Sequence, residues 1–285
     1  MCYTDIYRWN NGKGNHILQI INTIYYTYYF KELNKFKFPG HEYFSLIEGS
    51  FPKNKNSCSC DNRIDITRKI NPCCDNFLLS LEEMKDIYDK HITFKRELST
   101  TKIYDIGIHI RSGDIFGRNI HWEYVQPPLD YYIQFIEQNK GKSIVFVYEN
   151  TQNPVIDKII KYVNEKKANN DNDNDNDNYN IDFKSSCVLD DILTLTSCKN
   201  LVFSMGTFCL LPYLISSHIK RVFITSFMIN KPRGKNWYKI NENKNNVLIP
   251  FEKYMKAGAW KNKPEQVELM LNYKMDTKLY DKFKI

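Results

Sequence analysis

Residues 103–114, with the sequence IYDIGIHIRSGD, give the clearest fold signal in the chain. The run 103–110 is rich in β-branched residues and leads into the polar residues Arg111, Ser112, Gly113 and Asp114. This pattern predicts a buried strand that feeds a polar turn. Because side chains alternate along a strand, His109 and Arg111 are expected on the same side of it.

Downstream of this strand, helical and strand patterns alternate. Helical periodicity covers residues 129–138, 154–167, 190–198 and 208–217. Apolar, strand-like runs cover residues 143–148, 181–188, 201–204 and 221–225. The alternation predicts an α/β fold with a Rossmann-like, doubly wound parallel sheet in the second half of the chain.

The first hundred residues show a less regular pattern. A glycine-bearing turn at residues 11–14 precedes helical spacing over 15–30, and residues 43–47 are a short strand-like run. Ser80 and Glu83 form a capping-box pattern before a helix that is expected to end near His91.

The bulk composition narrows the class of protein. The 285 residues carry a formal net charge of +7 and are 42% hydrophobic, and lysine and arginine are scattered along the chain. Zinc-finger spacing and arginine-rich stripes are absent, so no nucleic-acid partner is expected. The chain lacks a signal-type segment and a run of about 18 apolar residues, so a soluble protein without a transmembrane segment is expected. We expect a cytoplasmic location. The many Asn, Lys, Ile and Tyr residues suggest an AT-rich genome, such as that of a protist or a large DNA virus. For a viral protein the location would be the host cytoplasm.

Two segments contain residues that bind metals in other proteins. The chain has eight cysteines, read as reduced thiols, of which Cys58, Cys60, Cys73 and Cys74 form a cluster. This cluster is interpreted either as a zinc site or as a cysteine-rich loop, and adjacent cysteines point poorly at one metal. The Asn/Asp tract at residues 169–178 predicts a disordered insertion, which would support a carboxylate metal pair badly. No metal site is predicted.

Arg111 is the strongest candidate for a functional residue. In doubly wound sheets, ligands bind beyond the carboxyl ends of the strands. A guanidinium stays charged and holds two phosphate oxygens at once, which suits a diphosphate leaving group. Gly113 would let the backbone approach a ligand, and Asp114 would orient Arg111 or accept a hydroxyl. The alternative is a structural Arg–Asp pair that closes the turn.

A second candidate segment is residues 200–208, NLVFSMGTF. It predicts a strand that ends in a turn of small residues, with Thr207 as the cap of the next helix. The hydroxyls of Ser204 and Thr207, and the backbone N–H groups around Gly206, are expected to face phosphate or ribose oxygens.

Four segments together resemble a known family. They are the N-G-x-G-N turn at residues 11–15 with Gln19, the H-I-R-S-G-D segment, the helix from Asp191 to Cys198 and the S-M-G-T-F turn. Their order is similar to that in the α-1,2-fucosyltransferases and relatives that form other linkages. The resemblance covers roughly residues 9–30, 104–150 and 186–226. Ser112 stands where the family usually has a second arginine.

The resemblance implies a GT-B-like architecture, with two Rossmann-like domains and a cleft between them. We expect an N-terminal, acceptor-side domain over residues 1–100 and a nucleotide-sugar-binding domain over 101–250 with the insertion at 169–178. A C-terminal helical segment over 251–285 is expected to pack back on the body. The resemblance assigns catalytic roles to His109, Arg111 and Asp114. It implies donor contacts from Gly12, Gly14, Asn15, Gly113, Asp191, Ser204, Gly206, Thr207 and Phe208.

The function that the resemblance implies is an inverting glycosyltransferase that needs no metal or other cofactor and moves fucose from GDP-fucose to a glycan hydroxyl. The partners would be the nucleotide-sugar donor and the glycan acceptor. A transferase for another nucleotide sugar and a non-catalytic nucleotide-sugar or glycan-binding protein are the alternatives. Candidates for a general base are His109, Asp114, His121 and Glu123.

Overall fold

The computed structural model describes most of the chain. The described residues are 3–5, 13–26, 36–37, 40–48, 50, 63–65, 79–98, 102–117, 120, 124–169, 179–228, 239–251 and 253–285. The cysteine cluster and nearly all of the Asn/Asp tract lie outside these residues. Within them, no helix is both long and apolar enough to cross a bilayer.

The centre of the molecule is a six-stranded sheet in which every neighbouring pair of strands is parallel. Its strands are β6 (Tyr104–Ile110), β7 (Ile144–Tyr148), β8 (Ile181–Lys184), β9 (Cys198–Val202), β10 (Arg221–Thr225) and β11 (Asn246–Ile249). Their spatial order is β8-β7-β6-β9-β10-β11. This is the strand order of dinucleotide-binding Rossmann sheets, so the predicted α/β fold with a doubly wound parallel sheet is confirmed.

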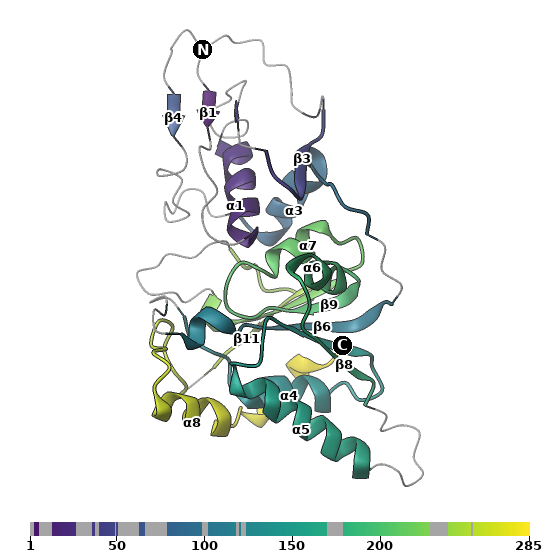
Figure 1. Ribbon diagram of the computed structural model, residues 1–285, viewed down its shortest axis with the longest axis vertical. Coiled ribbons are helices and arrows are strands. Elements are labelled where there is room, and N and C mark those ends of the chain that lie inside the picture. The colour runs from purple at the N-terminus through teal and green to yellow at the C-terminus, as the bar shows by residue number, and fades with distance from the viewer. Residues whose placement is uncertain are drawn as a thin grey trace.

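Helices cover both faces of the sheet (Figure 1). One layer holds α4 (Leu129–Glu137) and α5 (Pro154–Asn169), and the opposite layer holds α6 (Val188–Thr196) and α7 (Leu210–Ile215). Every residue of β7 is buried, and β6 is buried except at Asp105. Burial on both faces explains why these strands are continuous apolar runs and not alternating ones.

The C-terminal residues pack against α4. The helix α8 (Pro264–Asn272) and the 3-10 helix η7 (Thr277–Phe283) follow β11. Phe283 is fully buried, with its ring centroid 4.8 Å from that of Phe135 in α4. Nδ2 of Asn139 donates to the Phe283 carbonyl over 2.7 Å. The chain end therefore forms part of the helical layer.

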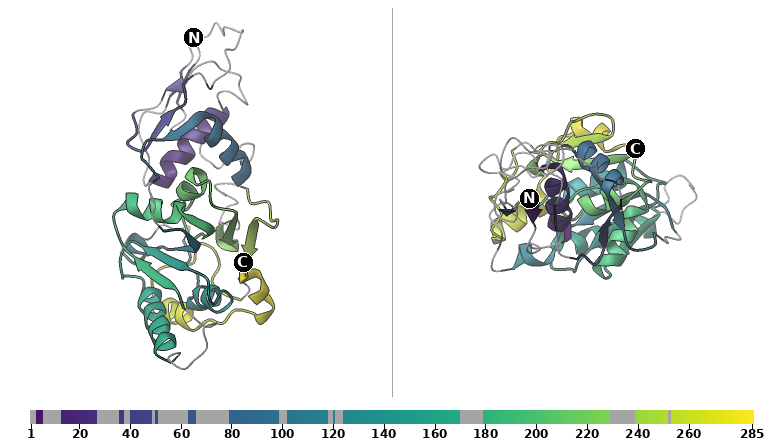
Figure 2. Two further views of the ribbon diagram at one scale, coloured as in Figure 1. Left: turned by 90° about the vertical axis from the view of Figure 1, so that its right-hand side faces the viewer. Right: turned by 90° about the horizontal axis from the view of Figure 1, so that it is seen from above.

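The described residues up to 98, here called the N-terminal lobe, lie at one end of the molecule (Figure 2). They contain α1 (Lys13–Ile24) and α3 (Leu81–His91), which pack on each other and on α7. The capping box of α3 is present, with Ser80 and Glu83 satisfying each other's backbone N–H groups. The strands of the lobe are short: β1 (Tyr3–Asp5), β2 (Phe36–Lys37) and β4 (Arg63–Asp65) are parallel, and β3 (Phe44–Leu46) pairs antiparallel with β5 (Ile92–Phe94).

Some predicted boundaries were wrong. The strand predicted over 181–188 ends at Lys184, and α6 begins at Val188, earlier than predicted. Cys198, placed in that helix by the sequence pattern, is the first residue of β9. Only Ser197 separates α6 from β9, and a connection of this length leaves no composition change to detect. The edge strand β11 was not predicted.

Candidate functional site

The candidate site lies at the carboxyl edge of the sheet, where β6 and β9 are neighbours. From β6 the chain moves outward to β7, whereas β9 leads to β10 on the other side. Sheets of this order bind ligands at such a switch point, because the two connections diverge there. Arg111 directly follows β6, and Ser204 lies two residues beyond β9. The fold therefore brings two of the predicted segments to this edge.

His109 joins these two segments. Its Nδ1 atom lies 2.6 Å from Oγ of Ser204. Its ring packs against that of Phe208, with 4.7 Å between the centroids. Burial, together with the charge of Arg111, lowers the pKa of His109 to about 3. The imidazole is therefore neutral at neutral pH and positions the Ser204 turn without adding positive charge.

Arg111 is held by Asp114 through one edge of its guanidinium. Nε and Nη2 donate to Oδ1 over 3.3 and 2.9 Å, and Nη2 also donates to Oδ2 over 2.8 Å. The pair ties the residue after β6 to the first turn of the 3-10 helix η3 (Gly113–Phe116), which begins at Gly113 with a φ of +65°. The ion pair that the sequence suggested as a structural alternative is thus present.

The other edge of the guanidinium faces the second predicted segment. A Cβ atom on Gly206 would lie 3.3 Å from Nη1 of Arg111, and Gly206 has a φ of +109°. A side chain at this position would be strained and would crowd the arginine. No described residue accepts a hydrogen bond from Nη1. Since this nitrogen carries two N–H groups, Arg111 keeps donors on the Gly206 side while Asp114 fixes its orientation.

Aromatic residues support the turn that carries Arg111. The Tyr124 ring centroid lies 5.3 Å from Cζ of Arg111. Trp260 is fully buried and donates from Nε1 to the Ile115 carbonyl over 2.8 Å, and its backbone N–H donates to the Tyr124 carbonyl over 3.2 Å. Burial disfavours the charged guanidinium, but Tyr124, Asp114 and Glu149 outweigh this effect and raise the pKa of Arg111. The site therefore keeps a positive charge that is only partly exposed.

Ser112 fixes the end of β6 to the end of β7. Its hydroxyl donates to Oδ1 of Asn150 over 2.7 Å and accepts from the Asn153 backbone N–H over 3.1 Å. Nδ2 of Asn153 donates to the Arg111 carbonyl over 2.9 Å. Ser112 is fully buried. A second arginine, as the resembled family has here, would have no space.

Glu149 is a site residue that the sequence analysis missed. It directly follows β7, and its exposed carboxylate lies over the backbone of Gly113, so that a methyl group on Gly113 would overlap it. An acidic residue immediately after a buried apolar run is the signal that could have pointed to it. Its place beside Arg111 depends on the strand order, which the sequence pattern did not give.

The N-terminal lobe meets the second segment directly. Oγ1 of Thr207 donates to Oδ1 of Asn15 over 2.9 Å, and Gly14 packs so closely on Thr207 that a methyl group would overlap the Thr207 carbonyl. Thr207 was predicted to cap a helix, but α7 begins only at Leu210. The Thr207 hydroxyl contacts α1 instead. Three of the predicted segments therefore meet around the Ser204–Phe208 turn.

Other predicted residues lie elsewhere. Asp191 is in the first turn of α6, where it accepts the Ser186 backbone N–H over 3.3 Å, and burial raises its pKa to about 6. No contact in the described part of the chain joins it to Arg111. Gly12, His121 and Glu123 lie outside the described residues.

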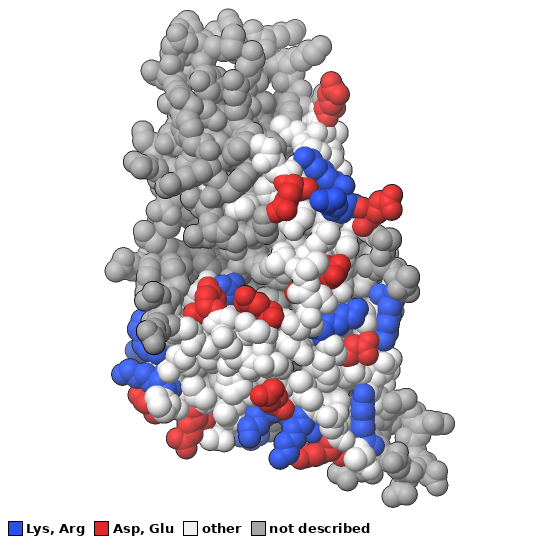
Figure 3. Space-filling view, viewed as in Figure 1, with Lys and Arg blue, Asp and Glu red and all other residues white. Residues whose placement is uncertain are grey.

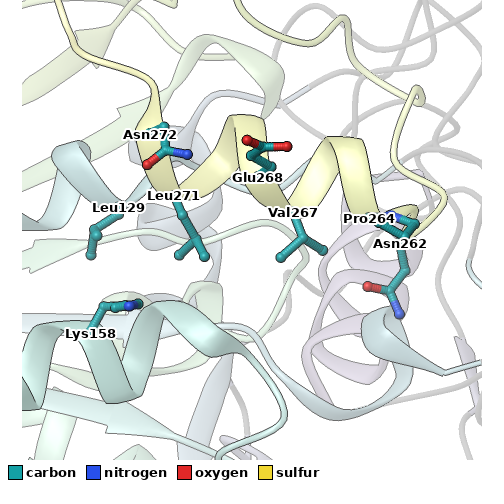
Figure 4. A pocket seen from close by; sticks show the side chains of 8 residues that line it. All are labelled: Leu129, Lys158, Asn262, Pro264, Val267, Glu268, Leu271 and Asn272. Carbon is teal, nitrogen blue, oxygen red and sulfur yellow. The ribbon is translucent and has the colours of Figure 1, made fainter.

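A separate groove of about 710 Å³ lies between α8 and α5 (Figure 4). Val267 and Leu271 point from α8 towards Leu129 and Lys158. The remaining lining residues are Asn262, Pro264, Glu268 and Asn272. One lysine and one glutamate offer no net positive charge for a diphosphate, so we do not place the anion site here.

Charges on the described surface are mixed. Figure 3 shows acidic and basic side chains interspersed over the described part of one face, without a continuous basic stripe. Among the described residues, no three His, Cys, Asp or Glu side chains come together as metal ligands would.

The arrangement at the carboxyl edge is suited to binding an anion. It combines one oriented, partly buried guanidinium, a glycine turn with positive φ, and neutral hydroxyl and imidazole groups. Such a site favours phosphate oxygens over a carboxylate-bound metal. Comparisons with protein-family models, with curated proteins and with solved structures found no match.

Proposed function

We propose that the chain is an inverting glycosyltransferase whose donor is a nucleotide sugar of the GDP-fucose type and whose acceptor is a glycan hydroxyl. The proposal depends on one observation above all: Arg111 stands at the switch point of a Rossmann-ordered sheet with Nη1 directed to the Gly206 turn. This is where a nucleotide diphosphate would lie in such a sheet. The resemblance to fucosyltransferases supplies the sugar, the inversion and the independence of metal.

In this mechanism the protein positions the reactants and stabilises charge. The acceptor oxygen attacks the anomeric carbon, a new carbon–oxygen bond forms, and the bond to the diphosphate oxygen breaks. Negative charge then accumulates on the leaving diphosphate, and Nη1 of Arg111 donates to it. Asp114 keeps the guanidinium in place through the opposite edge. Because Arg111 is only partly exposed, solvent screens this interaction less than it would in bulk water.

The same geometry bears on the candidates for a general base. His109 is buried, and a pKa of about 3 makes it a weak proton acceptor. Both oxygens of Asp114 accept hydrogen bonds from Arg111. Of the four candidates, His121 and Glu123 therefore stay open as proton acceptors.

In the proposed GT-B-like arrangement, the N-terminal lobe binds the acceptor and the C-terminal sheet binds the nucleotide. The contact between Asn15 and Thr207 brings the start of α1 to the carboxyl edge of the sheet. An acceptor bound by the N-terminal lobe would therefore approach the donor from the β9 side. The C-terminal sheet would hold the nucleotide.

Replacing Arg111 tests the proposal. We expect the unchanged chain to be stabilised against thermal unfolding by GDP or UDP and to transfer sugar from the matching donor. Arg111→Ala should lower the rate of transfer by about 100-fold or more, the usual effect of losing one charge-stabilising donor. The matched control is Arg96→Ala, because Arg96 is exposed on the loop after β5.

The outcomes separate the alternatives. Wild-type transfer by Arg111→Ala would refute the assigned site. Nucleotide-dependent stabilisation without transfer or donor hydrolysis would indicate the non-catalytic binding protein. Absence of any response to GDP, UDP and their sugars would refute the proposed function.

A further inference from the structure

Glu149 has an unusual setting for an acidic residue beside a proposed diphosphate site. Its side chain is exposed, and no residue in the described part of the chain forms a hydrogen bond or ion pair with its carboxylate. The backbone is nevertheless fixed, because Oγ of Ser185 donates to the Glu149 carbonyl over 3.0 Å. The carboxylate lies over Gly113. Its negative charge is one of the causes that raise the pKa of Arg111.

The position of Glu149 in the sheet suggests a ligand group. Counted outward from the switch point, β6 is the first strand and β7 the second. In a Rossmann βαβ unit, a nucleotide whose phosphates lie at the end of the first strand extends its ribose over the end of the second. A carboxylate there accepts hydrogen bonds from ribose hydroxyls. Glu149 directly follows β7 and has both oxygens available.

The N-terminal lobe and Glu149 lie on opposite sides of Arg111. The N-terminal lobe contacts Thr207 and α7, on the β9 side of Arg111. Glu149 follows β7, on the opposite side of β6. With the diphosphate at Nη1, the sugar would face the lobe and the nucleoside would face β7. An acceptor hydroxyl arriving from the lobe would not reach Glu149, which argues against a role as the general base.

We propose that Glu149 binds the vicinal 2′- and 3′-hydroxyls of the donor ribose and so selects ribonucleotides. This inference rests on the proposed function and extends it to the nucleoside part of the donor. A carboxylate can accept from both hydroxyls of a cis-diol at once. Gly113 contributes by having no side chain, because a methyl group there would displace the carboxylate.

Calorimetric titration with GDP, UDP and their 2′-deoxy counterparts tests the inference. The unchanged chain should bind the ribonucleotide about 10-fold or more tightly than its 2′-deoxy form, the range of one hydrogen bond to a charged group. Glu149→Ala should weaken ribonucleotide binding by a similar factor and remove the discrimination. Glu149→Gln keeps the size of the side chain and should lose most of the discrimination between the ribonucleotide and its 2′-deoxy form. Glu165→Gln, an exposed glutamate on α5, is the control and should bind as the unchanged chain does.

Three results would overturn the inference. The first is equal binding of both nucleotides by the unchanged chain, and the second is undiminished discrimination in Glu149→Ala. The third is Glu149→Gln with unchanged nucleotide affinity and a lower kcat for transfer, which would assign proton transfer to Glu149. Each of these leaves the nucleotide site itself in place. Failure of the unchanged chain to bind any of the nucleotides would instead contradict the proposed function and this inference together.

Discussion

The geometry of Arg111 is compatible with both roles that the sequence presented as alternatives. Asp114 holds Nε and Nη2, which closes the turn after β6 as a structural pair would. Nη1 stays on the Gly206 side, where a ligand would meet it. The ion pair therefore orients the arginine without using all of its donors. A planar guanidinium allows this division, whereas a lysine ammonium has no second edge.

The buried His109 predicts how stability depends on pH. Its pKa is about 3 in the folded protein and about 6.5 in an unfolded chain. The unfolded state therefore binds more protons between these values, so the contribution of neutral His109 is fully present above pH 6.5 and is lost as the pH falls towards 3. The free energy of unfolding should fall by up to about 1.4 kcal/mol per pH unit from this residue.

Urea denaturation at several pH values between 7.5 and 4 measures this dependence. We expect a shallower fall for His109→Asn, which removes the titrating group and keeps a polar partner for Ser204. Parallel curves for the two proteins would show that His109 is not buried in the neutral form.

The start of α1 is the element that joins the N-terminal lobe to the Ser204–Phe208 turn. Gly14→Ala would force a methyl group against the Thr207 carbonyl and to within 2.7 Å of Thr207 Oγ1. We expect the free energy of unfolding to fall by about 1–3 kcal/mol from overpacking, measured by urea denaturation. Gly40→Ala is the matched control, because a Cβ atom there meets none of the described residues within 4 Å. Equal stability of the two variants would contradict the close contact between α1 and the turn.

The elements show which parts of the fold can be predicted from sequence. The long apolar runs of β6 and β7 and the periodic helices α4 and α5 were confirmed, because each buries a continuous face. The α6–β9 boundary was misplaced, since a single residue connects the two elements. The edge strand β11 was missed because it is short and its pairing with β10 is a tertiary contact.

The residues of the candidate site could likewise be predicted only where they lie in a local sequence pattern. Arg111, Ser204 and Gly206 lie in local patterns, so they could be proposed from the sequence. Glu149 and Tyr124 are site residues only because of the strand order and the Trp260 contact. Which strand ends become neighbours is decided by packing across the whole sheet, and this information is not local.

At the scale of the whole molecule, one hydrophobic core extends from α1 to Phe283. The N-terminal lobe is placed on α7 and the carboxyl edge of the sheet, and the α5–α8 groove lies on the opposite helical layer. Among the residues that the structure describes, these are two candidate regions for a ligand. Of these two, the region between β6 and β9 combines an oriented cation with a glycine turn.

A crystal structure of the chain with bound GDP tests the central claim most directly. We predict that diphosphate oxygens lie at hydrogen-bond distance, about 2.7–3.2 Å, from Nη1 of Arg111 at the β6–β9 edge, with Asp114 still holding the other edge of the guanidinium. A diphosphate bound in the α5–α8 groove, or one bound anywhere that leaves Arg111 without a phosphate contact, would contradict the account.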